Sequence, residues 1–72
     1  MDAWTQAHMR MIEARDAMHR AESAVVTEVE FYLLDEEHGV TSEAIRARLK
    51  ERVRVAREAE AAWRSAVDAL AA

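Results

Sequence analysis

Large apolar residues and small residues recur every seven positions through most of this 72-residue chain. In the first half, large side chains form one such column, which consists of Trp4, Met11, Met18, Val25 and Tyr32. A second column lies between them and is mostly alanine, with Ala7, Ala14, Ala21 and Glu28. The second half has an equivalent pair of columns, formed by Leu49, Ala56, Trp63 and Leu70 and by Ile45, Arg52, Ala59 and Ala66. An apolar seam with this period is typical of α-helices that pack side by side. The pattern therefore predicts an all-α fold built from two long helices.

The single glycine marks the place where the chain turns back on itself. Gly39 follows the first pair of columns, at a position where many helices end in the left-handed conformation that glycine adopts without a Cβ clash. Thr41 is then the expected N-cap of the second helix, and Val40 and Ile45 are spaced as a hydrophobic staple. Together these residues predict a helical hairpin.

The expected hairpin is one domain that covers residues 1–72. Its first helix should span about residues 3–37, its turn about 38–41 and its second helix about 42–70. Because so short a turn makes the helices antiparallel, residues whose numbers sum to about 80 should lie at the same level of the hairpin.

At this register the alanine columns of the two helices meet. Ala21 falls opposite Ala59, and such small side chains allow the helix axes to approach to about 8 Å. Trp4 and Trp63 both lie on the seam, and we expect both of them to pack in the core.

One level of the seam is charged. Glu28 falls opposite Arg52, which predicts an ion pair inside the seam, near the turn. A buried polar pair can fix the alignment of two helices while it adds little net stability. We interpret the pair as a contact that sets the register, and a functional role for Glu28 is the alternative.

Apolar residues also lie outside the seam, so a single hairpin leaves much apolar surface uncovered. Each helix carries two further apolar stripes: Ile12, Val26 and Leu33; Ala17, Ala24 and Phe31; Val55, Ala62 and Ala69; Val53 and Val67. We therefore expect self-association, in its simplest form a two-fold dimer that makes a four-helix bundle. A different protein that covers the turn end is the main alternative, and a hairpin that stays alone is the remaining one.

Composition limits the compartment and the chemistry. The absence of cysteine excludes disulfides and thiolate metal sites. The first residues lack the basic segment and apolar run of a signal peptide, and no apolar stretch approaches the roughly 18 residues of a membrane span. We therefore expect a cytoplasmic protein without a membrane partner. Nine of the ten basic residues are arginine, a bias that we interpret as the codon usage of a GC-rich genome, in a bacterium or a phage.

Two Asp–His pairs raise the possibility of a metal site. Asp16 and His19 stand three residues apart, as do Asp35 and His38, and bundle di-iron sites use pairs with this spacing. However, His19 lies off the seam, His38 belongs to the turn, and the second helix contains no histidine. We interpret the histidines as surface residues and expect neither a metal nor a cofactor, with a metal-binding bundle as the alternative.

Basic residues concentrate in the second half of the chain. Residues 1–38 carry three basic and nine acidic groups, for a net charge of −6, whereas residues 39–72 carry seven and five, for a net charge of +2. We expect the stripe on the second helix to be solvated or internally paired; it contains Lys50, Arg54, Arg57 and Arg64. A nucleic-acid-binding four-helix bundle is the alternative, although the total charge of −4 and the lack of interleaved aromatic residues argue against it.

No segment has the pattern of a catalytic motif. The chain lacks a glycine-rich phosphate loop and a Ser or Thr matched to a His on a neighbouring helix face, so we expect that it is not an enzyme. The expected partner-binding surface is the group of apolar residues nearest the turn, namely Val26, Phe31, Leu33 and Leu34. The sequence thus predicts a non-enzymatic protein–protein interaction module, a small self-associating hairpin that acts as a regulator, an inhibitor or an assembly factor.

Overall fold

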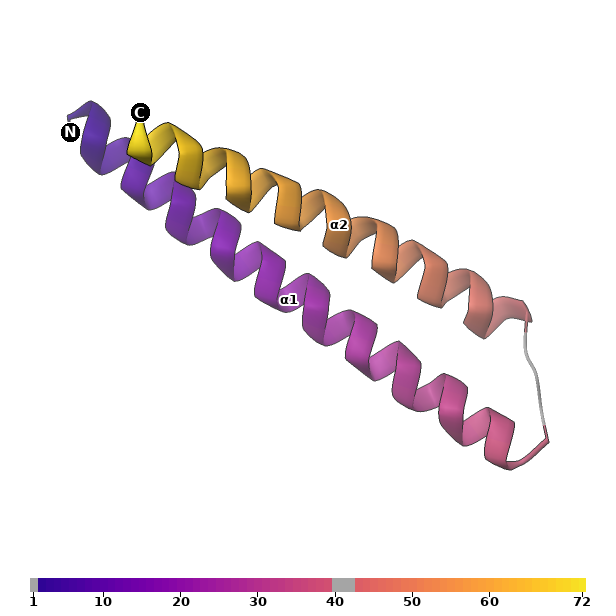
Figure 1. Ribbon diagram of the computed structural model, residues 1–72. Helices are drawn as coiled ribbons and strands as arrows, with labels where there is room; N and C mark the ends of the chain where they lie inside the picture. The colour runs from indigo at the N-terminus through magenta and orange to yellow at the C-terminus, as the bar shows by residue number, and fades with distance from the viewer. Residues whose placement is uncertain (1, 40–42) are drawn as a thin grey trace.

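The computed structural model describes residues 2–39 and 43–72, and it folds them into two helices. Helix α1 spans Ala3–Glu37 and helix α2 spans Glu43–Ala71. The helices pack side by side and antiparallel, with both termini at one end of the molecule and the turn at the other (Figure 1). The result is a slender rod of 56 × 15 × 13 Å, so the expected all-α hairpin is confirmed.

Helix α1 begins with an aspartate cap that the heptad pattern did not predict. Oδ1 of Asp2 accepts a hydrogen bond from the backbone N–H of Thr5 at 2.7 Å, and the carbonyl oxygen of Asp2 accepts from Gln6 N–H at 3.1 Å. The first bond satisfies an amide group that has no partner within the helix, and the second is the first backbone hydrogen bond of the helix. The hydrogen bond from the Thr5 backbone favours the charged carboxylate and lowers the pKa of Asp2 below its ordinary value.

Helix α1 ends at the expected glycine. Gly39 has a φ of +71°, in the left-handed region, and its N–H donates to the carbonyl oxygen of Glu36 at 3.0 Å. His38 contributes two bonds to the carbonyl oxygen of Leu34, from its backbone N–H at 3.3 Å and from ring Nδ1 at 2.8 Å. The last turn is therefore closed by the backbone and by an imidazole together. The expected cap Thr41 and the staple residue Val40 lie outside the described residues.

The seam holds the hairpin together. Met18 and Glu28 are the buried residues among those described, each 8% exposed, and the other seam positions are mostly half-buried. The alanine layers of the seam lie toward the termini, whereas Glu28 occupies the alanine column near the turn.

The prediction that Trp4 belongs to the core is wrong. Its side chain is 62% exposed, and its ring lies against that of His8, with the centroids 5.1 Å apart. Helix α2 ends at Ala71, so no residue of α2 lies level with Trp4. Trp63, by contrast, is half-buried at mid-seam, and its indole Nε1 is buried without a hydrogen-bond partner in the part of the chain that the structure describes.

The conformation of Gly39 leads to a stability prediction. A Cβ added at this residue would meet no atom of residues 2–39 or 43–72 within 4 Å, so Gly39→Ala should cost only the strain of a left-handed alanine, about 1 kcal/mol in the free energy of unfolding. Gly39→Asn should cost less, because asparagine tolerates this conformation better. Urea unfolding at one fixed protein concentration would measure both values. An alanine variant as stable as the parent chain would contradict this account.

Candidate interaction surface

The four residues expected to bind a partner do not form one surface. Val26, Phe31, Leu33 and Leu34 are all exposed, between 51% and 56%. Successive residues of a helix are about 100° apart, so Phe31 lies roughly 140° around α1 from Val26. Val26 and Leu33, seven residues apart, share one side of α1, whereas Phe31 and Leu34 share another. Helix geometry thus divides the expected patch between two sides of α1, with Leu34 about 80° from Val26 and about 60° from Phe31.

The side of Val26 continues across to α2. A shallow groove runs between the helices there and is lined by Glu22, Val25, Val26, Val53, Ala56, Arg57 and Glu60. A second hollow extends it along α2 toward the turn, past Val53, Lys50 and Leu49. We call this side the groove face and define it by the outer residues Glu22, Val26, Lys50, Val53, Arg57 and Glu60. It carries an apolar centre with charges of both signs around it.

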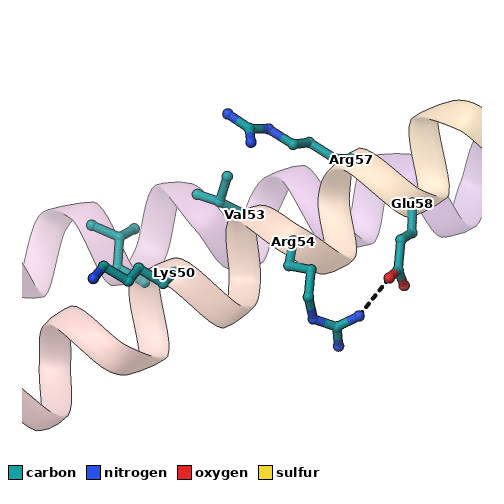
Figure 2. Close-up of a pocket in the computed structure, with 6 residues that line it drawn as sticks. Lys50, Val53, Arg54, Arg57 and Glu58 are labelled. Carbon is teal, nitrogen blue, oxygen red and sulfur yellow. Dashed lines mark hydrogen bonds and ion pairs between the residues drawn. The ribbon is translucent and has the colours of Figure 1, made fainter.

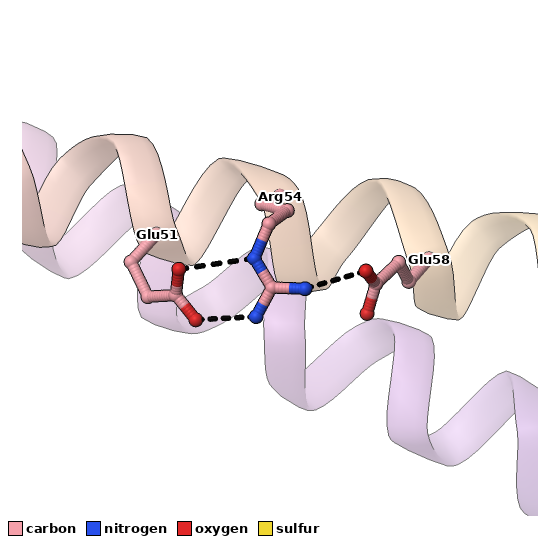
Figure 3. Close-up of polar contacts among 3 residues, drawn as sticks. All are labelled: Glu51, Arg54 and Glu58. Atoms are coloured by element: carbon pink, nitrogen blue, oxygen red, sulfur yellow. Dashed lines mark hydrogen bonds and ion pairs between the residues drawn. The ribbon is translucent and has the colours of Figure 1, made fainter.

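Two of the four residues of the basic stripe, which only the nucleic-acid alternative would use for binding, are already engaged within α2. Arg54 lies between two carboxylates and donates to both, with its Nε 3.0 Å from Oε2 of Glu51 and its Nη1 bonded to Glu58 (Figure 3). Hydrogen bonding to Glu51 raises the pKa of Arg54 and lowers that of Glu51. Arg64 similarly donates to Glu60 at 2.6 Å. This part of the basic stripe is internally neutralised.

The other two residues of the stripe are free. Lys50 and Arg57 are exposed and make no ion pair with any residue in 2–39 or 43–72. The side chains of Arg57 and Arg54 extend from opposite sides of α2 (Figure 2). Both free cations border the groove face, so they are available to an acidic group from another molecule.

The seam ion pair has two arginines where the sequence pattern pointed to one. Oε1 of Glu28 lies 3.9 Å from Nε of Arg52, and Oε2 lies 3.5 Å from Nε of Arg48. The carboxylate is buried, whereas the side chains of Arg48 and Arg52 are 57% and 52% exposed. Oε2 has no hydrogen-bond partner among the described residues, so Arg48 stabilises it by charge alone.

The histidine pairs do not converge on a metal site. Within residues 2–39 and 43–72, no three side chains of the His, Asp and Glu types come together as ligands. Nδ1 of His38 is occupied by the carbonyl oxygen of Leu34, and His19 lies exposed beside Glu22 and Ser23 in a hollow on the outside of α1.

Neither described helix combines the length and the apolar character needed to cross a lipid bilayer.

Comparison with known proteins identifies no relative: no protein-family model, no curated protein and no solved structure matches this chain.

The geometry at Glu28 predicts that removing the buried carboxylate and removing its two arginine partners have different effects on stability. Glu28→Leu should leave the hairpin equally stable or about 1 kcal/mol more stable, because both arginines remain solvated. The double variant Arg48→Met with Arg52→Met should lose about 2 kcal/mol, because it leaves a buried carboxylate without a counter-charge. Thermal or urea unfolding at pH 7 would measure both.

The triple variant is the matched control for this pair of results. Adding Glu28→Leu to the two methionine substitutions removes the unpaired carboxylate, so it should restore the lost stability. A destabilised Glu28→Leu together with a neutral double methionine variant would show that the pair does not act in this way.

Proposed function

We propose that this chain is a non-enzymatic protein–protein interaction module, a helical hairpin that self-associates and offers a second apolar surface to another protein. A regulator, an inhibitor or an assembly factor of bacterial or phage origin has these properties. The observation that carries the proposal is the amount of surface that the hairpin leaves exposed.

The exposed area is large for the size of the chain. A monomeric globular protein of 8.2 kDa exposes about 4,500 Å², whereas this hairpin exposes 5427 Å². The excess of about 900 Å² is close to the roughly 800 Å² that one partner buries in a standard interface. A rod with one internal interface therefore has the surface that a second protein molecule would cover.

The exposed apolar residues are also concentrated in one part of the hairpin. Five large apolar residues more than a third exposed lie in the part of α1 nearest the turn, namely Val26, Val29, Phe31, Leu33 and Leu34. Scattered single residues of this kind are ordinary on protein surfaces, but a concentration of them marks a site of interaction. The hollows on the described surface are open to solvent, which favours docking of a protein over enclosure of a small substrate.

A nucleic-acid-binding bundle is the second candidate, and the free cations Lys50 and Arg57 favour it. Under this alternative, the affinity for a short duplex should fall as salt rises, and Arg57→Ala should reduce the slope on a logarithmic plot by about one. Arg64→Ala is the matched control, because Arg64 is already bonded to Glu60. Our proposal expects no saturable binding at physiological salt.

The split of the apolar residues gives a sharp test of self-association. Leu33→Glu places a charge on the same side of α1 as the groove face, so it should weaken the dimer at least about tenfold. Leu34→Glu changes the adjacent residue on the other side and should leave the dimer intact. Light scattering over a concentration series would give the mass of each variant. A parent chain that stays at 8.2 kDa throughout would overturn the self-association.

Binding of another protein to the surface that carries Phe31 and Leu34 can be tested separately from self-association. Leu34→Glu should lose a protein that the parent chain retains from a lysate of the native host, while Leu33→Glu should retain it. Loss in both variants would indicate that binding of the other protein requires the dimer.

A further inference from the structure

We infer that two copies of this chain dimerise through their groove faces with both turns at the same end, so that α1 of each copy packs on α2 of the other. This inference rests on the proposed self-association and specifies its geometry. It follows from charge, from the distribution of apolar residues along the rod and from the levels at which groove residues lie.

Two symmetric arrangements can bring two groove faces together. If the two-fold axis runs along the rod, the turns lie at the same end and α1 faces α2 of the second copy. If the axis crosses the rod, the turns lie at opposite ends and each helix faces its own equivalent. Both make a four-helix bundle, so the side chains must decide between them.

Charge favours the arrangement with the turns together. Residues 1–38 carry a net charge of −6 and residues 39–72 a net charge of +2. With the turns apart, the strongly acidic α1 would lie against a second acidic α1. With the turns together, each acidic helix lies against the basic helix of the other copy, where Lys50 and Arg57 have no ion pair of their own within the described residues. Like charges face each other when the turns are apart, and opposite charges face each other when the turns are together.

The groove residues match level by level in the same arrangement. A two-fold axis along the rod preserves height, so residues at one level within a hairpin also share that level between copies. Val26 and Val53 line one groove with Glu22 and Arg57. In the dimer, Val26 therefore meets Val53 of the second copy, and Glu22 meets its Arg57. An apolar contact and an ion pair form at neighbouring levels, and the two-fold axis repeats each of them.

The level of Arg15 is unfavourable in this arrangement. Arg15 falls near the level of Arg64 of the second copy, which places two cations together. Each is already paired on its own helix, Arg15 with Asp16 at 3.5 Å and Arg64 with Glu60 at 2.6 Å. These pairs reduce the repulsion, and the level lies away from the apolar half of the groove face.

Apolar surface is also unevenly distributed along the rod. On the groove side of α1, the exposed residues Val26, Val29 and Leu33 all lie in the third of the helix nearest the turn. With the turns together, these residues from the two copies lie at the same end of the bundle, where Val26 meets Val53 and where Val29 and Leu33 fall near the levels of Lys50 and Arg46. With the turns apart, they would lie at opposite ends of the bundle, each beside the polar half of the other copy. The arrangement with the turns together thus keeps the apolar thirds of the two copies at one end of the bundle.

This geometry has a functional consequence. Phe31 and Leu34 point away from the groove face, and two copies of this surface would stand at the same end of the bundle. A protein that binds there would meet a bivalent site, and two linked contacts bind more tightly than one when the spacing allows both.

Spin labels can distinguish the two arrangements, because the chain contains no cysteine that would need to be removed. Met9→Cys, Ser23→Cys and Glu37→Cys place the label at exposed positions on one side of α1, near one end, the middle and the other end. Pulsed dipolar spectroscopy on each labelled homodimer would give three distances between equivalent labels. With the turns together, the three distances should be nearly equal.

Every other outcome counts against the inference. A short distance at Ser23 with much longer ones at Met9 and Glu37, approaching the 56 Å length of the rod at Glu37, would establish the arrangement with the turns apart and leave self-association standing. An absence of dipolar coupling in all three variants, with a mass of 8.2 kDa, would overturn both the inference and the self-association. Circular dichroism of each labelled variant would verify that the helices are intact.

Discussion

The packing of α1 on α2 along a single seam is the constraint on which the rest of the structure depends. Two helices have only one interface between them, so even the seam residues are mostly half-buried, and Met18 is the one apolar residue among those described that is buried. Alanine layers allow the helix axes to approach closely and compensate in part for this thin core. Side chains on the outer sides of the helices are exposed, whatever their chemistry.

This constraint explains why exposed apolar residues are informative here. In a thicker domain, an exposed leucine can be incidental, because about half of any protein surface is apolar. In this hairpin the exposed residues include Val29 and Leu33 on one side of α1 and Phe31 on another, and neither side can be covered by the chain itself. These uncovered sides are the basis on which we propose self-association.

Much of the architecture could be predicted from the sequence, because the period of seven and one glycine determine a hairpin almost alone. The point at which the seam ends, near the termini, was predicted less accurately. Trp4 continues the heptad pattern, but α2 ends before it reaches that level. Arg48 was missed because the register rule assigns one residue opposite Glu28, whereas a long arginine one helical turn away also reaches the carboxylate.

The candidate surface was harder to predict than the fold. Val26 through Leu34 look like one cluster in the sequence, but neighbouring helix positions point in different directions, so the cluster divides between two sides. The pairing of Arg54 with Glu51 and Glu58 carried a readable signal, since i, i+3 and i, i+4 spacing of opposite charges predicts it. The freedom of Lys50 and Arg57 becomes visible only once the groove between the helices is known.

Glu28 shows how one costly residue can define the alignment of an otherwise repetitive seam. Alanine and large residues repeat every seven positions, so sliding α2 by one heptad would still match apolar side chains with one another. At the charged level, however, a slide that sets the buried carboxylate of Glu28 opposite Ala59 would remove it from both Arg48 and Arg52. A buried carboxylate without a counter-charge should cost about 2 kcal/mol. Because the arginines are exposed and the carboxylate is buried, the information that excludes this slipped hairpin resides in α1.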